Sequence, residues 1–133
     1  MTQNIKRILY ATDLSANSTY AFGYAVNLAR KFDASITILY VIDKTMETSQ
    51  MILYSYLTDA QLKENSQKRI NHITEEINQR LSAFTDRQLT DHQEPADIVT
   101  SIEICQGYPA DEILKKSDAL HCNAIVMGTH GKG

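Results

Sequence analysis

The sequence predicts one α/β domain built on a doubly wound parallel sheet, and three observations carry that prediction. Short apolar runs rich in β-branched residues alternate with amphipathic helical patterns, as in a parallel sheet with crossover helices. The 133 residues, of which 43% are hydrophobic and 22% charged, suffice for one core. No internal repeat or low-complexity tract breaks the alternation. Residues 1–133 are therefore expected to form a single domain.

The first strand and helix are the clearest elements. An apolar run over 5–11 predicts a buried strand, and apolar residues then recur every three or four positions, which predicts a helix over 16–32. Ser15 or Ser18 can cap this helix. Gly23 lies inside it, where a glycine costs up to about 1 kcal/mol relative to alanine unless it allows close packing on the sheet.

The next part of the chain predicts a second strand and a long helix. Residues 35–42 are β-branched and mostly apolar, which is typical of a strand covered on both faces. Residues 43–56 show no clear period. A capping box at 58–61 and apolar residues along one face up to Phe84 predict the helix. The polar stretch 86–97 predicts a connection.

Two further strands and a helix complete the alternation. A strand is expected over 98–105 and a helix from Pro109, which suits the first helical position and is followed by Asp111 and Glu112. The apolar run 124–127 predicts a fourth strand. If the first two crossovers step in one direction and the third returns past the start, the strand order is 3-2-1-4. Strands one and four then meet at a switch point, where such sheets bind ligands.

Charge and cysteine content exclude several classes of function. With 13 basic and 16 acidic residues the net charge is −3, which removes the electrostatic basis for binding nucleic acid or an anionic membrane. No window approaches the roughly 20 apolar residues of a membrane span, and no signal-peptide layout is present, so a cytoplasmic protein is expected. Cys105 and Cys122 lack zinc or redox spacing and are interpreted as small buried apolar residues.

The loops after strands one and four predict a nucleotide site. Backbone amides of the glycine-rich end 128–133 can cradle phosphate oxygens, and Lys132 can add a cation. The carboxylate of Asp13 can accept hydrogen bonds from ribose hydroxyls or hold Mg²⁺. The end of strand two, 40–42, offers backbone groups beside an apolar wall for a base. Each element alone is more often a turn, a flexible end or core, so their convergence carries the prediction.

Four segments carry a resemblance to a known family. They are 8–15 (Ile-Leu-Tyr-Ala-Thr-Asp-Leu-Ser), 39–42 (Leu-Tyr-Val-Ile), 107–110 (Gly-Tyr-Pro-Ala) and 125–131 (Ile-Val-Met-Gly-Thr-His-Gly). In this order, over essentially the whole chain, they resemble the universal stress protein family. The resemblance implies a Rossmann- or flavodoxin-like fold, often dimeric, in bacterial stress physiology, and some members of the family bind ATP.

For the ATP-binding members, the resemblance implies a set of residues around the nucleotide. The set is Ala11, Thr12, Asp13, Val41, Met127, Gly128, His130 and Gly131. Asp13 would lie by the ribose and a nucleotide-bound Mg²⁺, the backbone of Val41 would meet the adenine, and the last four residues would line the ribose and phosphates. Ala11 stands where many ATP-binding members have proline.

The chain departs from the family pattern after the Gly-x-x-Gly at 128–131. The family motif continues over roughly nine residues to a further Gly and a Ser or Thr, whereas this sequence ends at Gly133. The resemblance therefore implies that the chain is truncated, without a final helix and the fifth strand that often makes dimer contacts. Its fourth strand is then expected to present an apolar edge that invites association. A shortened reading frame and a natural short form that borrows its edge from a partner both explain this ending.

Two functions remain open at this point. The first is a cytoplasmic universal stress protein that binds ATP or a related adenine nucleotide as a regulatory ligand. The sequence holds no Walker lysine motif or paired nucleophile and base, which leaves at most slow hydrolysis or autophosphorylation. The second is a dimerising protein-interaction module without nucleotide, in which the segment 51–57 forms a partner surface or packs beneath the long helix. A nucleotide-dependent enzyme of the wider adenine-nucleotide α-hydrolase-like group is disfavoured, because residues 12–15 contain no glycine.

Overall fold

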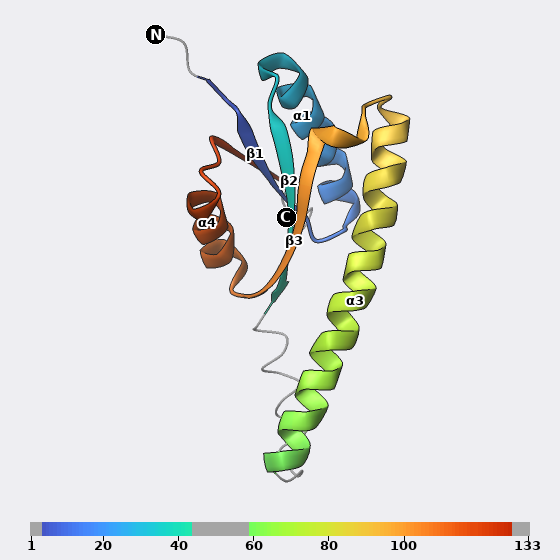
Figure 1. Cartoon of the computed structure of the whole chain (residues 1–133), viewed down its shortest axis with the longest axis vertical. Coiled ribbons are helices and arrows are strands. Elements are labelled where there is room, and N and C mark those ends of the chain that lie inside the picture. Colours follow the sequence, from blue (N-terminus) through green and yellow to red (C-terminus); the bar gives the residue numbers. More distant parts are fainter. Residues whose placement is uncertain (1–3, 44–58, 129–133) are drawn as a thin grey trace.

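The strands and helices alternate along the chain as expected (Figure 1). The computed structural model describes residues 4–43 and 59–128, so the segment 51–57 and the first position of the predicted capping box lie outside it. The elements are β1 (Arg7–Ala11), α1 (Ala16–Phe32), β2 (Ser35–Asp43), α3 (Asp59–Asp91), a 3-10 helix (Ala96–Ile98), β3 (Val99–Gly107), α4 (Pro109–Ala119) and β4 (Ala124–Met127). Helix α1 and strand β4 have the predicted bounds, and the ends of the other strands differ from prediction by one or two residues.

The four strands form one parallel sheet in the order β3-β2-β1-β4, which confirms the predicted topology. Strands β1 and β4 pair directly, with Ala11 opposite Met127. Asn123 secures the start of this pairing, because its Oδ1 accepts hydrogen bonds from the backbone N–H groups of Lys6 (2.7 Å) and Arg7 (3.0 Å). The carboxyl ends of the first and last strands are therefore neighbours, which is the condition for a switch-point site.

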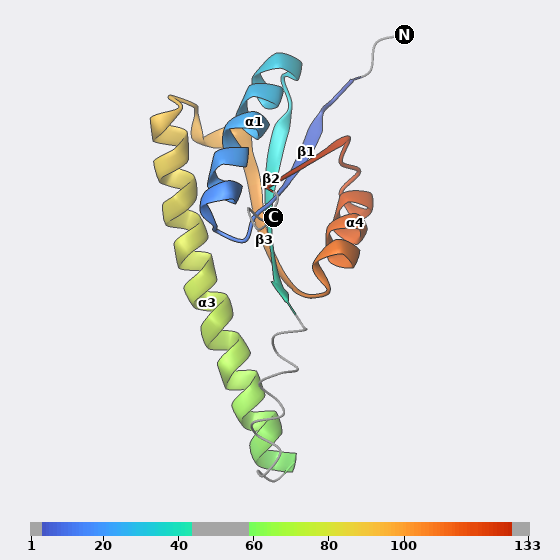
Figure 2. The ribbon, with the colours of Figure 1, turned by 180° about the vertical axis from the view of Figure 1, so that it is seen from behind.

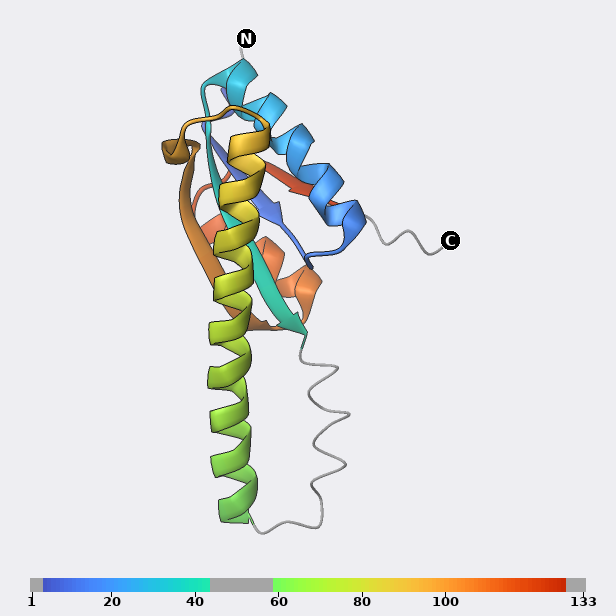
Figure 3. The ribbon, with the colours of Figure 1, turned by 90° about the vertical axis from the view of Figure 1, so that its right-hand side faces the viewer.

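Helices cover both faces of the sheet, but unequally. Figure 2 shows α1 and α3 on one face and α4 on the other. The buried core under α1 and α3 consists of Ile8, Tyr10, Ala21, Phe22, Ala25, Val26, Ala29, Ile36, Ile38, Ile77, Leu81 and Leu89. The core under α4 consists of Leu9, Ala11, Leu39 and Ile113. Strand β2 contributes to both cores, as predicted, and the first half of α3 extends past the carboxyl edge of the sheet (Figure 3).

Helix α3 continues to Asp91, so the prediction of a connection over 86–97 was wrong for its first half. Leu89 is buried in the larger core, four residues after the buried Thr85 and eight after the buried Leu81, so the buried face of the helix continues to its end. A left-handed Gln93 (φ 57°) then closes the helix, and the N–H of Glu94 bonds to the carbonyl of Leu89 (2.9 Å). No helix among the residues that the structure describes is both long and apolar enough to cross a bilayer.

Gly23 does not serve close packing on the sheet. A Cβ atom placed there would meet only the ring of His92, with Cε1 at 3.7 Å, which is an ordinary van der Waals contact. The glycine therefore lies where α1 faces the segment that follows α3. Arg30 holds the same two segments together, because it donates hydrogen bonds to the carboxylate of Glu94 and to the carbonyl of His92 (2.6 Å).

The two cysteines are half-buried against the smaller core. Burial raises the pKa of Cys105, and the charge of Glu112 raises it further. Burial also raises the pKa of Cys122. Both thiols therefore remain protonated at neutral pH, although they are half-buried and not fully buried as the sequence predicted.

Candidate functional site

The predicted site residues come from strands whose carboxyl ends share one edge of the sheet. Ala11 pairs with Met127 on one side and with Leu39 on the other. The N–H of Thr12 still donates to the carbonyl of Leu39 (3.0 Å), and Val41 lies two residues further along β2. The structure thus gathers Ala11, Thr12, Asp13, Val41, Met127 and Gly128 at this edge. The predicted residues His130 and Gly131 lie outside the described residues.

The loop between β1 and α1 is held by its own side chains. Thr12 Oγ1 accepts a hydrogen bond from the N–H of Leu14 (2.9 Å), and Asp13 Oδ1 accepts one from the N–H of Ser15 (2.9 Å). Ser15 in turn caps α1, because its hydroxyl accepts from the N–H of Ser18 (3.2 Å). The Asp13 side chain is exposed, so its carboxylate faces the solvent at the carboxyl edge.

A buried group of hydroxyls lies directly beneath this loop. The Tyr10 hydroxyl donates to the carbonyl of Ser18 (2.5 Å), and the Ser18 hydroxyl donates to Thr12 Oγ1. All three side chains are buried. Burial raises the pKa of Tyr10, so its hydroxyl stays a donor throughout the neutral range. Sequence reasoning missed Tyr10 and Ser18, although a tyrosine inside a buried strand always raises the question of what its hydroxyl bonds.

Two further side chains share the electrostatic surroundings of Asp13. Tyr40 lies near the carboxyl end of β2, and burial raises the pKa of its hydroxyl. The nearby charge of Arg80 on α3 lowers that pKa, while the carboxylate of Asp13 raises it. The charge of Arg80 therefore opposes that of Asp13 at Tyr40, and it was not foreseen because Arg80 comes from the middle of a long polar helix.

Gly128 brings the end of β4 against the first turn of α1. A Cβ atom at this position would lie 2.8 Å from the backbone C and O of Asn17 and from the backbone N of Ser18. Only glycine fits without moving the helix or the strand. A ligand at this edge of the sheet therefore meets β4 and the amino end of α1 together, and exposed N–H groups at a helix start favour anions.

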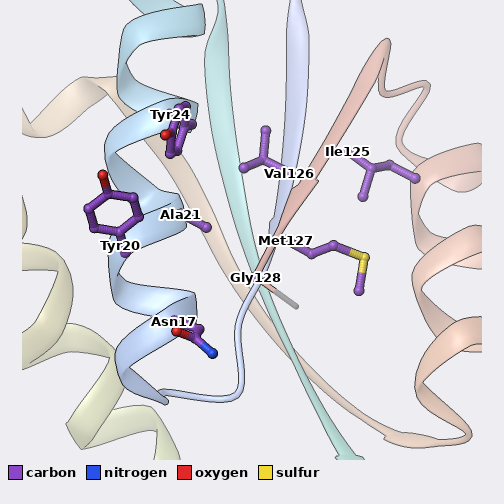
Figure 4. Close-up of a pocket in the computed structure, with 8 residues that line it drawn as sticks. All are labelled: Asn17, Tyr20, Ala21, Tyr24, Ile125, Val126, Met127 and Gly128. Carbon is purple, nitrogen blue, oxygen red and sulfur yellow. The ribbon is translucent and has the colours of Figure 1, made fainter. Parts of the chain in front are cut away.

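An open hollow of about 440 Å³ lies beside this point, between α1 and β4. It is lined by Asn17, Tyr20, Ala21, Tyr24, Ile125, Val126, Met127 and Gly128 (Figure 4). Val126 points towards α1, whereas Ile125 and Met127 point towards the side of α4 (Figure 4). Tyr20 and Tyr24 are both exposed, and their rings pack edge to face with centroids 5.7 Å apart. The sequence analysis did not single out these tyrosines, although their spacing places them on one helix face.

The donor set at this edge is limited for a metal ion. Within residues 4–43 and 59–128, no cluster of three or more His, Cys, Asp or Glu side chains is arranged to hold one. Asp13 alone supplies a carboxylate at the β1 end, and Mg²⁺ prefers several oxygen ligands. A magnesium ion here would fit only if a nucleotide phosphate and water completed its coordination.

Comparison with known proteins identifies the family. The model of the universal stress protein family matches residues 4–133. The chain belongs to this family. It is similar to the universal stress protein MJ0531 of Methanocaldococcus jannaschii, with 29% identity over 131 residues that cover 96% of this chain and 66% of that protein. A protein of Staphylococcus aureus strain USA300 with the same family name is 32% identical over 127 residues, covering 95% and 67%. This universal stress protein thus spans about two thirds of the length of the curated relatives it matches.

Solved structures show the same fold. The hypothetical protein MJ0577 superposes on this universal stress protein with a TM-score of 0.72 at 23% identity, covering 98% of this chain and 78% of that chain. UspA from Lactobacillus plantarum superposes with a TM-score of 0.60 at 24% identity, covering 98% and 83%. At these identities the likeness concerns the backbone arrangement.

Proposed function

We propose that this universal stress protein binds ATP or a related adenine nucleotide as a regulatory ligand at the carboxyl edge of β1, β2 and β4. The register of the sheet is the observation that supports the proposal. Ala11 lies between Leu39 and Met127, so groups suited to base, ribose and phosphate come within reach of one ligand from distant parts of the chain. The switch point of a doubly wound sheet is the usual place for such a ligand.

Three of the described residues have a defined part in the proposed complex. The exposed carboxylate of Asp13 accepts hydrogen bonds from ribose hydroxyls, and the backbone of Val41 meets the base. Gly128 lets the end of β4 pack against the first turn of α1, so that phosphates at this edge meet both elements. Mg²⁺, when bound through Asp13 and the phosphates, neutralises phosphate charge. His130 and Gly131 belong to the proposed set through the family resemblance.

The proposal also covers the cellular context of the protein. Residues 1–133 act as one domain in the cytoplasm and form homodimers or higher oligomers. The nucleotide acts as a regulatory ligand, and its hydrolysis or the autophosphorylation of the protein is at most slow. The sequence supports this part of the proposal, since it holds no Walker lysine motif and no membrane-length apolar run.

Calorimetric titration with ATP, with and without Mg²⁺, tests the ligand. Wild-type protein should bind, and Asp13→Asn should bind about ten-fold more weakly or worse, because the ribose hydroxyls lose a charged acceptor. Asparagine keeps an oxygen for the N–H of Ser15, so the loop is preserved. Asp33→Asn is the matched control. Asp33 is exposed and left-handed (φ 54°) at the end of α1, where asparagine is tolerated, and it precedes β2 at the opposite edge of the sheet. Absence of wild-type binding at millimolar ATP, or equal affinities of the two variants, contradicts the proposal.

A second candidate is the interaction module without nucleotide, and the edge of the sheet favours it. Among the described residues, β4 is the last strand, and its sequence Ala-Ile-Val-Met carries no charge to deter pairing with another strand. Analytical ultracentrifugation then measures how the average mass rises with protein concentration, and Ile125→Lys should reduce this rise. Leu114→Lys, at an exposed leucine on α4, is the control and should not. Self-association that survives Ile125→Lys contradicts a β4-mediated contact.

A further inference from the structure

We propose that the buried hydroxyls of Tyr10 and Ser18 position Asp13, and that they thereby set the preference of the site for nucleotides that carry ribose hydroxyls. This inference rests on the proposed function, because it concerns how the same site recognises the sugar. Neither residue touches the ligand. Both act through the loop 12–15 and are therefore positioning residues.

A continuous series of hydrogen bonds joins the core to the loop. The Tyr10 hydroxyl donates to the Ser18 carbonyl (2.5 Å) and lies 3.2 Å from the Ser18 hydroxyl. The Ser18 hydroxyl donates to Thr12 Oγ1, which also accepts from the N–H of Leu14 (2.9 Å). Asp13 lies between these two anchored residues, so the direction of its side chain depends on how Thr12 and Leu14 are held.

The loop needs such anchoring because it holds a strained residue. Leu14 has a φ of 64°, in the left-handed region, where the side chain of a non-glycine residue is strained. The bond from its N–H to Thr12 Oγ1 keeps it there. If Thr12 loses its bond from Ser18, its side chain is free to rotate and Leu14 can relax, and either change turns Asp13.

The core supplies a rigid base for the series. The Tyr10 ring packs edge to face against Phe22, with centroids 5.0 Å apart, and is stacked on Phe84 at 6.3 Å. No buried side-chain nitrogen or oxygen in the described part of the chain lacks a hydrogen-bond partner. A fully satisfied buried network holds one geometry, because every alternative leaves a polar group unpaired.

The test compares ATP with 2′,3′-dideoxy-ATP, which lacks both ribose hydroxyls. The variants are Tyr10→Phe, which removes one hydroxyl and keeps the ring, and Ser18→Ala. Thr85→Val is the matched control, since the Thr85 hydroxyl is equally buried and donates to a helix carbonyl, that of Leu81 (2.7 Å), without contacting the loop. Dissociation constants are measured by calorimetry on protein shown to be folded by circular dichroism.

Wild-type protein and Thr85→Val should prefer ATP over the dideoxy analogue by the same ratio. Tyr10→Phe and Ser18→Ala should lower that ratio about three- to ten-fold, with most of the change in the affinity for ATP. A purely structural role predicts that the variants lower the melting temperature as Thr85→Val does and leave the ratio unchanged. That result overturns the inference.

Amide hydrogen exchange of the ligand-free protein separates this inference from the proposed function. The N–H groups of Leu14 and Ser15, which bond to the side chains of Thr12 and Asp13, should exchange faster in Tyr10→Phe and Ser18→Ala than in Thr85→Val. Unchanged exchange overturns the positioning role even if ATP binds. If wild-type protein binds no ATP, the proposed function fails, and the claim about ribose fails with it, whatever the exchange rates show.

Discussion

The strands β1 and β4 lie side by side and frame the candidate site, yet they differ in almost every other respect. Leu9 and Ile125 are register partners, and Leu9 is 0% exposed whereas Ile125 is 37% exposed. Strand β1 is central, with strands on both sides and helices on both faces, while β4 pairs only with β1 among the described residues. One wall of the site is therefore part of the core, and the other is an open edge. The buried strand β1 can hold a ligand in one orientation, and the exposed edge at β4 leaves it a path into the site.

The first prediction measures this difference with one pair of substitutions. Leu9→Ala should lower the free energy of unfolding by about 2–5 kcal/mol, because it leaves a cavity in a packed core. Ile125→Ala should lower it by no more than about 1.5 kcal/mol, because the side chain is already partly in water. Urea unfolding followed by circular dichroism gives both values. Equal losses would mean that the edge of β4 is covered in solution.

The second prediction compares two glycines whose nearest neighbours lie at different distances, Gly128 against the backbone of α1 and Gly23 against the ring of His92. Gly128→Ala should destabilise the protein by about 1–3 kcal/mol, since the new Cβ meets the backbone of α1 at 2.8 Å. Gly23→Ala should stabilise it by up to about 1 kcal/mol, because the Cβ meets only the His92 ring at 3.7 Å and alanine favours the helix. Thermal unfolding measures both. If Gly128→Ala is as stable as wild type, β4 is not packed tightly against α1.

The third and smallest effect is the pH dependence of stability, and it concerns Tyr10 in the buried strand β1. Burial raises the pKa of Tyr10 above its ordinary value of 10.0, so the unfolded chain releases this proton at a lower pH than the folded protein does. The resulting stabilisation is complete below pH 10 and is lost as the pH rises through 10 towards the folded pKa. The free energy of unfolding should therefore fall above about pH 10, and less steeply in Tyr10→Phe than in wild type. Thr85→Val removes no titrating group and should keep the wild-type slope. If Tyr10→Phe also keeps that slope, Tyr10 is not the group that causes the loss of stability.

Local patterns were sufficient for most of the secondary structure. The helix Ala16–Phe32 follows from regular apolar spacing and a serine cap, and the strand Ala124–Met127 follows from an uninterrupted apolar run. The residues up to Asp91 did not reveal that they continue α3, because the buried positions there are Thr85 and Leu89, and a threonine is not recognised as part of an apolar face. Pattern reasoning fails where a polar residue takes a buried position.

For the candidate site, the sequence could indicate which residues supply the chemistry, but not which buried residues hold them in place. Asp13 and the glycines were recognisable because carboxylates and glycine loops have known uses beside nucleotides. The buried hydroxyls under the loop were not recognisable, since Ser18 reaches Thr12 only after α1 has packed on the sheet. The same holds for Arg80, whose charge reaches Tyr40 because α3 packs on the larger core.

The sequence by itself determined the alternation of strands and helices and the family, because these depend on residues close together in the chain or on their linear order. Only the tertiary structure decided that Gly128 touches the first turn of α1 and that β4 is half exposed. These features arise where distant segments meet, and contacts between distant segments depend on packing geometry that no local pattern records.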